Sequence, residues 1–371
     1  MRAIGWIAAL AVCGSLVWYR ASGASPADLR LASTERTYAR SAADPRPQRL
    51  PASATRQSLD VARIIGDSLA WAHPQEVEVV GSHLVVADLR GARPLVRVDR
   101  RTGDLRPFAR FGRGPGEFLW PRSIEDAGGG RAWIYDLQGA RATLYDLAEP
   151  ELRHAEIAAV PGNLFQTVRM GDTLVANGLF PHEVLRVHAR HENGFRLARK
   201  EAVTPFSREL PDVVMLIGRT ALAADPARRR LVVAYQFRNQ LDFFDRHGRK
   251  VGSVAGPRDF TPVYRVVPDP REKMNRFVPT GSTQYAYLDV AASERRVYAL
   301  FSGKARGDGS EDVSQATEVH VFDWDGRLLD VLTLAQPVFR IALDPATGVL
   351  YGLRSEPFPG VVEFHPLKGE A

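Results

Sequence analysis

The sequence predicts an all-β fold, a six-bladed β-propeller of four-stranded antiparallel blades. One observation is a repeat: runs that end in an apolar residue and Asp, or a similar residue, recur six times. They end at residues 99, 146, 188, 245, 323 and 365, separated by 47, 42, 57, 78 and 42 residues. The second is that no segment after residue 60 has a helical period over more than two turns. Strand-only repeats of about 40 to 50 residues are typical of propellers.

Turn signals and further strands complete each repeat. Asp323-Trp-Asp-Gly326 is one such turn, in which Asp and Gly tolerate the positive φ of a tight hairpin. We therefore interpret these Asp residues as turn formers and not as catalytic acids. A second apolar run lies upstream of every match, at residues 84–88, 132–136, 173–177, 231–235, 296–300 and 348–352.

The two ends of the chain are expected to meet in one blade. The last repeat, from about residue 338 to 367, lacks a fourth, outermost strand, and Leu59–Ile65 precedes the first inner strand. Pairing the two closes the ring and removes its open edges. The propeller is therefore predicted to span residues 59–371.

The N-terminus predicts export. Arg2 is followed by an uncharged apolar stretch over residues 4–19, which is the pattern of a secretory signal and is short for a spanning helix. Cleavage after Ala24, an uncleaved anchor, and a lipoprotein acylated at Cys13 all remain open. Each predicts that residues 1–24 are a signal peptide or membrane anchor and that the body lies in the periplasm or cell envelope, or is secreted.

Residues 25–58 are rich in Ala, Pro, Ser and Arg and have no apolar periodicity, so they predict a disordered linker. The body beyond it has no cysteine, because Cys13 is the single one in the chain. The chain has 49 Lys and Arg against 43 Asp and Glu, and these charges are interspersed. This pattern argues against nucleic-acid binding. We expect a monomer that contacts a membrane only through its N-terminal segment.

Two motifs resemble known propeller families. Phe111-Gly-Arg-Gly-Pro-Gly-Glu-Phe118 resembles the link between blades of NHL-type propellers. Residues 298–304 and 319–326 resemble the TolB-like six-bladed propellers of bacterial exported proteins. The resemblance covers about residues 59 to 367. It implies the fold and very little about function, since members of these groups are mostly uncharacterised or serve as binding platforms.

No residue pattern predicts a reaction. The sequence has no nucleophilic serine motif, no usable cysteine and no histidine pair with a metal-spaced carboxylate, so we assign no catalytic residue, metal or cofactor. The alternative is a lactonase- or lyase-type enzyme with a metal in the central channel. It follows from a resemblance to gluconolactonase-like propellers, and its candidate ligands are Glu76, Glu125, Asp126 and Asn177.

The loops of one face are rich in basic residues. Connections between second and third strands share a face with the links between blades, and an insertion at 257–283 lies in one of these links. The composition of these loops predicts that this face is a basic, aromatic-lined surface. We expect it to bind a protein, peptide or glycan ligand, including an anionic one. The alternative is that arginine is simply the default surface residue here. The candidate binding residues are Arg93, Arg113, Arg141, Arg238, Tyr264, Arg265, Arg271, Arg276, Lys304 and Arg354.

Overall fold

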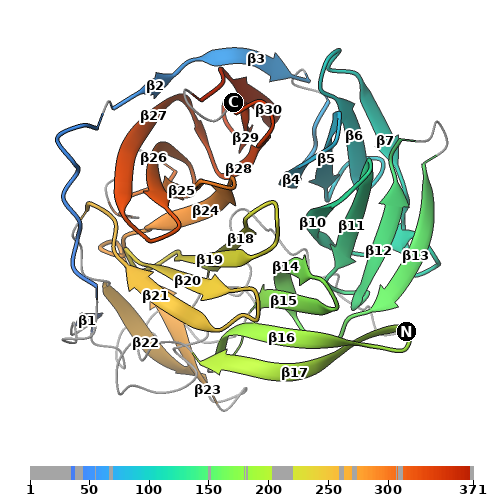
Figure 1. The fold of residues 1–371 in the computed structure, drawn as a ribbon, viewed down its shortest axis with the longest axis horizontal. Coiled ribbons are helices and arrows are strands. Elements are labelled where there is room, and N and C mark those ends of the chain that lie inside the picture. Colours follow the sequence, from blue (N-terminus) through green and yellow to red (C-terminus); the bar gives the residue numbers. More distant parts are fainter. Residues whose placement is uncertain are drawn as a thin grey trace, which may run out of the picture.

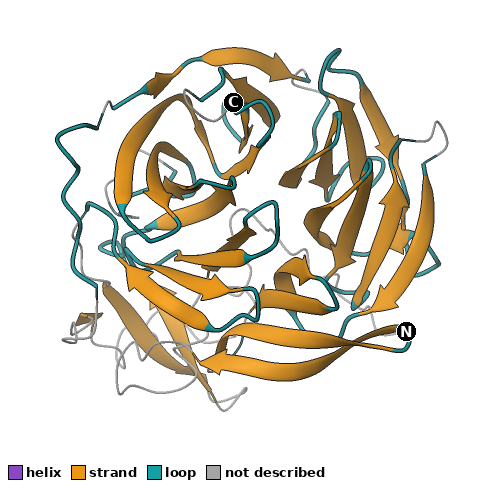
Figure 2. Ribbon diagram, viewed as in Figure 1, coloured by secondary structure: helices purple, strands orange, loops and turns teal. Residues whose placement is uncertain are grey.

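The structure is a computed structural model, and it describes most of the chain beyond residue 44. The described residues are 35–37, 45–54, 56–66, 70–148, 152–178, 180, 183–202, 220–258, 263–269, 274–305, 307 and 312–367. The predicted signal or anchor at residues 1–24 lies outside them. Every regular element is a β-strand (Figure 2). No helix in the described part of the chain is long and apolar enough to cross a membrane.

Of the 30 described strands, 24 form six four-stranded antiparallel blades around a central axis (Figure 1). Blades 1 and 2 are β4 (Pro74–Val80), β5 (His83–Asp88), β6 (Leu95–Asp99), β7 (Leu105–Phe108); and β10 (Pro121–Gly128), β11 (Arg131–Asp136), β12 (Arg141–Asp146), β13 (Arg153–Ala159). Blades 3 and 4 are β14 (Leu164–Met170), β15 (Thr173–Gly178), β16 (Glu183–His191), β17 (Gly194–Ala202); and β18 (Thr220–Ala224), β19 (Arg230–Tyr235), β20 (Leu241–Asp245), β21 (Lys250–Val254). Blades 5 and 6 are β24 (Tyr287–Ala292), β25 (Arg296–Phe301), β26 (Ala316–Asp323), β27 (Leu328–Val338); and β28 (Arg340–Leu343), β29 (Leu350–Arg354), β30 (Gly360–Phe364), β3 (Val61–Ile65). The predicted fold class is confirmed.

Ring closure occurs in blade 6, as the sequence predicted. Strand β3 pairs antiparallel with β30, so the outermost strand of the last blade comes from the start of the domain (Figure 1). The strand just before it, β2 (Ser58–Leu59), pairs with a different blade: it lies parallel to β27 of blade 5. The N-terminal segment therefore ties two neighbouring blades together.

Part of the segment expected to be a disordered linker contacts the propeller. The Gln48 amide donates to the carbonyls of Ala255, at 3.2 Å, and Gly326, at 2.8 Å, and its oxygen accepts from the Leu328 N–H at 3.0 Å. Strand β1 (Glu35–Thr37) pairs with β22 (Val263–Asp269). The insertion at 257–283, expected as a loop, thus contains the hairpin of β22 and β23 (Met274–Pro279).

The core lies between adjacent blades. Second strands are buried on both faces, as in β5, where Leu84, Val85, Val86 and Ala87 are all fully buried. Such strands need continuous apolar runs, which is why the sequence showed them in every repeat. The Asp turn formers are confirmed: the Asp323 carboxylate accepts from the backbone N–H groups of Asp325 and Arg327 at 3.0 and 2.8 Å.

One buried side chain lacks polar partners. His188, on β16, is 1% exposed, and neither ring nitrogen has a hydrogen bond. Burial lowers the pKa of His188 to about 4. The folded state therefore favours the neutral ring, while the unfolded chain takes up a proton near pH 6.5. The stabilisation of the folded state by the neutral His188 ring is complete above pH 6.5 and is lost as the pH falls towards 4.

We predict that His188→Leu removes this acid sensitivity. The wild-type protein should lose about 2 kcal/mol of unfolding free energy from this group between pH 7.5 and pH 5, and the variant should not. Urea unfolding at both pH values measures the difference. His191→Leu, at an exposed position of the same strand, is the control. Equal acid sensitivity of the wild-type and His188→Leu proteins would contradict the prediction.

Candidate functional site

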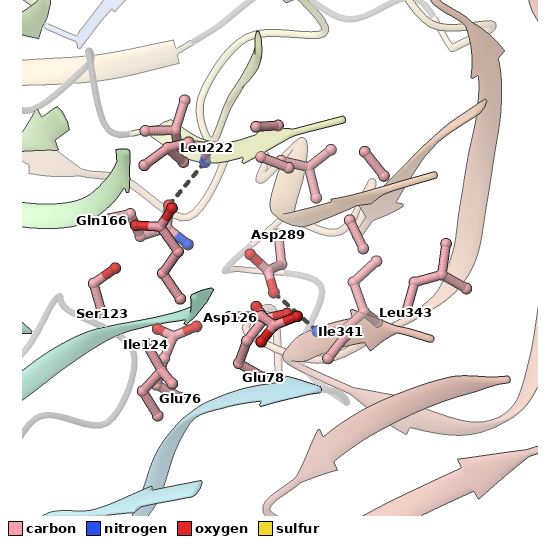
Figure 3. A pocket seen from close by; sticks show the side chains of 18 of the residues that line it. Glu76, Glu78, Ser123, Ile124, Asp126, Gln166, Leu222, Asp289, Ile341 and Leu343 are labelled. Atoms are coloured by element: carbon pink, nitrogen blue, oxygen red, sulfur yellow. Dashed lines mark hydrogen bonds between the residues drawn. The ribbon is translucent and has the colours of Figure 1, made fainter. Parts of the chain in front are cut away.

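The inner strands of all six blades line a narrow central channel that encloses a cavity of about 100 Å³ (Figure 3). Four inner strands, β4, β10, β14 and β24, share an irregularity of register near their start. The first paired residues after it are Glu76, Ser123, Gln166 and Asp289, all of which line the channel. Such bulges redirect side chains, so the polar lining follows from a recurring backbone feature.

Most of these polar groups bind the next blade. The Ser123 hydroxyl accepts from the Thr167 N–H at 3.0 Å, and the Gln166 side-chain oxygen accepts from the Leu222 N–H at 2.8 Å. Asp289 accepts from the Ile341 N–H at 2.9 Å (Figure 3). These bonds join blades 2 to 3, 3 to 4 and 5 to 6, and they satisfy backbone donors that would otherwise be buried without partners.

The channel carboxyl groups hold their protons unusually tightly. Burial raises the pKa of Glu76 to about 7 and that of Glu78 to about 8, against the pull of nearby arginines. The Arg340 guanidinium lies 3.5 Å from the Glu76 carboxylate, yet one Glu76 oxygen, Oε2, is buried without a hydrogen bond. Removal of water thus outweighs the ion pair at this position.

A second arginine reaches into the channel from the β18–β19 turn. Arg228 lies 3.4 Å from a Glu125 carboxylate oxygen and donates to the Asp126 carbonyl at 3.2 Å. Glu125 also accepts from the Arg169 N–H at 2.9 and 3.0 Å. Burial raises the pKa of Glu125 despite these contacts.

The residues proposed as channel-metal ligands do not fit a divalent cation. Glu76, Glu125 and Asp126 do line the channel. Asn177 does not, because its amide bonds Gln166 at 3.2 Å and the Thr220 carbonyl at 2.9 Å. Within the described ranges, no three His, Cys, Asp or Glu residues are grouped to hold a metal ion. We therefore draw no reaction step through a metal.

A second hollow lies on the face that carries the loops, between blades 2 and 3. This blade 2–3 groove has a volume of about 790 Å³, within the range of small-molecule sites. Links between blades, the β11–β12 and β15–β16 connections and one strand residue line it. The lining residues are Arg113, Trp120, Leu137, Gln138, Ala140, Gly162, Asn163, Phe180 and Arg186.

Buried hydrogen bonds fix one wall of the groove. The Asp136 carboxylate, at the end of β11, accepts from the N–H groups of Leu119 and Trp120 at 3.0 and 2.8 Å. Gly139 makes this possible, since a Cβ there would lie 2.3 Å from the Asp136 carboxylate. Arg141 donates to the Arg113 carbonyl at 3.0 Å and also to the Glu117 carbonyl. The NHL-like link is thereby held rigid.

The groove presents hydrogen-bond donors. The Arg186 guanidinium lies 4.0 Å from the centre of the Phe180 ring, and its nearest carboxylate, Glu183, is 3.5 Å away. The Arg186 Nε and the Trp120 indole nitrogen are both buried without an acceptor. Arg113 is exposed. None of the nine described lining residues carries a carboxylate, so the groove suits a ligand rich in acceptor atoms.

The structure spreads the other candidate binding residues around the ring. Arg113 lines the groove and Arg141 supports it. Arg238, Tyr264 and Arg354 are buried, so these side chains do not present a surface. Arg93, Arg265 and Lys304 are not among the described lining residues of the groove; the first two are exposed and Lys304 is half-buried. Arg271 lies outside the described residues, and only the backbone of Arg276 is described, in β23.

Sequence reasoning missed Trp120, Phe180 and Arg186. The first two lie in loops of the predicted face, and their aromatic character was a usable signal. Arg186 lies inside strand β16, so a search of loop composition could not find it. In the channel, Glu78 and Asp289 were also missed. A bulge shifts the alternation of inward and outward residues, so the pattern of β24 alone does not place Asp289 in the channel.

The fold and these two hollows define a six-bladed β-propeller with a ligand-sized groove on its loop face. Residues 61–344 match the family described as TolB-like 6-blade propeller-like, and the chain belongs to that family. No curated protein matches its sequence.

Solved structures share the fold at low sequence identity. A protein from Bacteroides fragilis that is described as exported is 10% identical, with a TM-score of 0.52 over 86% of this chain and 98% of its own. Regucalcin from Agrobacterium tumefaciens, a calcium-binding protein, is 10% identical, with a TM-score of 0.48 over 84% and 95%. The Cps50 (Swd1) propeller domain of Myceliophteria thermophila is 13% identical, with a TM-score of 0.47 over 82% and 99%.

We predict that Glu76→Gln stabilises the protein in alkaline solution. A carboxyl group with a raised pKa binds its proton more tightly in the folded state, so its contribution to stability falls as the pH rises from 4.5 to about 7. The variant should gain up to about 3 kcal/mol at pH 8.5 and little at pH 4.5, measured by urea unfolding. Glu294→Gln, at an exposed position, is the control. A loss of stability at pH 8.5 would show that the charged form of Glu76 supports the ring.

Proposed function

We propose that the protein is an exported, non-catalytic recognition propeller that binds an anionic protein, peptide or glycan ligand through its loop-bearing face. The blade 2–3 groove is the binding site. The observation that carries this proposal is the positive charge of the groove: Arg113 and Arg186 line it, and none of its nine described lining residues is acidic. Arginine pairs well with carboxylates and phosphates because its planar fork can donate two parallel hydrogen bonds.

The rigidity of the groove supports the same function. Trp120 donates a partly buried hydrogen bond to the Asp136 carboxylate, and Arg141 donates to the Arg113 carbonyl, so both parts of the link are held in place. A preformed site loses little conformational entropy when it binds, so more of the contact energy appears as affinity. Loops held on a rigid scaffold commonly carry binding function.

The channel favours a structural role over the enzymatic alternative. Its carboxylates bond the backbone of the next blade or lie beside arginines, as for Glu125 and Asp289. A lactonase-type site needs acidic groups gathered around one open position, and the described channel residues do not provide that arrangement.

Export rests on the apolar segment at residues 4–19 and on the TolB-like family, whose members are typically periplasmic. We predict that the full chain, expressed in bacteria with its own N-terminus, fractionates with the periplasm, envelope or medium. Deletion of residues 1–24 should retain it in the cytoplasm, as immunoblotting of the fractions would show. Mass spectrometry of the mature N-terminus separates a start at Ser25 from a lipidated Cys13 or an intact anchor.

We predict that Arg113→Glu weakens binding of anionic ligands at least tenfold. The substitution places a negative charge in the groove, at an exposed position where folding should be unaffected. Arrays of acidic peptides and acidic glycans, followed by calorimetric titration of the ligands that bind, measure the effect. Arg265→Glu makes the same charge change at an exposed position on β22 and should leave binding intact. Equal losses in the two variants would indicate a general charge effect and overturn the proposed site.

A further inference from the structure

We infer that the blade 2–3 groove selects an acidic saccharide, a short stretch of sugar units that carries carboxylate or sulfate groups. This inference rests on the proposed function and narrows its ligand class. It goes beyond the charge of the groove and depends on the neutral side chains and the shape around the arginines.

The charged part of the ligand faces a fixed set of donors. The Arg186 guanidinium lies over the Phe180 ring, 4.0 Å from its centre, and its 3.5 Å contact with Glu183 is too long for a strong ion pair. Arg113 also lines the groove and is exposed. A ligand acid group in the groove would complete the hydrogen bonding that Arg186 makes only weakly within the protein.

The neutral part of the groove matches the hydroxyl groups of a sugar. Gln138, in the β11–β12 connection, and Asn163, in the link to blade 3, are both exposed on the lining. Each side-chain amide has donors and an acceptor, and a hydroxyl group needs both. Trp120, which also lines the groove, is half-buried, and its indole offers an apolar ring face. A pyranose ring has an apolar face and a polar edge, which match this ring face and the two amides.

The groove lacks what peptide recognition usually requires. Its lining consists of loop and link residues, with Arg186 as the single residue from within a strand, so it offers no strand edge for an added β-strand. Phe180 is 2% exposed, and the Arg186 guanidinium lies over its ring. Trp120 and Leu137 are half-buried, so these lining residues offer only partial apolar surface to anchor a peptide side chain. The volume of about 790 Å³ fits a few sugar units and is small for a protein interface.

The test compares acidic ligands of different chemical class, and one uncharged ester, on the full chain, purified after export. The probes are a galacturonic acid trimer, its methyl ester, a sulfated cellulose trimer, and a hexapeptide with three glutamates, each titrated by calorimetry. We expect the galacturonate or the sulfated trimer to bind at least tenfold more tightly than the ester and the peptide. Asn163→Leu should weaken the saccharide at least fivefold, while Asn193→Leu, at an exposed turn of β16–β17, should not.

The outcomes separate this inference from the proposed function. Peptide binding that equals or exceeds saccharide binding, is lost in Arg113→Glu and is unchanged in Asn163→Leu would overturn the saccharide class and leave the anionic groove standing. Failure of all four probes to bind, or binding unaffected by Arg113→Glu, would overturn both. Thermal melting of each variant shows that it is folded. Arg113→Gln and Asn163→Ala replace any variant that is not.

Discussion

Each blade buries its apolar faces only against its two neighbours, and this constraint governs the structure. Strands such as β5 are covered on both sides, so an open row of blades would leave two apolar faces in water. The chain resolves this by pairing β3 with β30, which joins its two ends in one blade. Strand β2 and Gln48 extend the same seam to blades 4 and 5. Much of the stability of the ring therefore depends on residues 45–65.

The same ring closure determines the role of the polar side chains in the central channel. Six inner strands converge on the axis, and their backbone donors need partners where water has little room. Ser123, Gln166, Glu125 and Asp289 supply acceptors to the next blade. Burial of these carboxyl groups disfavours their charged forms and so raises the pKa of Glu76 and Glu78. Acidic residues at the centre of a propeller can thus hold the ring together without binding a metal.

The proposed binding site lies on the outer part of the loop face, where the backbone need not repeat. The groove forms between blades 2 and 3 because the NHL-like link, the short β11–β12 turn and the β15–β16 connection meet there. Asp136 accepts a hydrogen bond from the Trp120 N–H, and Arg141 donates to the Arg113 carbonyl, so this link is fixed to blade 2. Arg265, the described arginine of strand β22 in the blade 4–5 insertion, is not among the described lining residues of this groove.

The sequence by itself determined the repeat, the blade number, the Asp turns and the closing strand, because these follow from local patterns. Apolar runs fix which strands are buried, and Asp with Gly fixes the turns between them. It also predicted a basic loop face that includes Arg113, a residue that lines the blade 2–3 groove. Only the tertiary structure decided which arginines share a site. Arg238 and Arg354 follow the same local pattern as Arg113 but are buried, while Arg186 comes from within a strand. A groove between two blades depends on how residues far apart in the chain are placed in space. Short-range sequence patterns carry no information about these spatial positions.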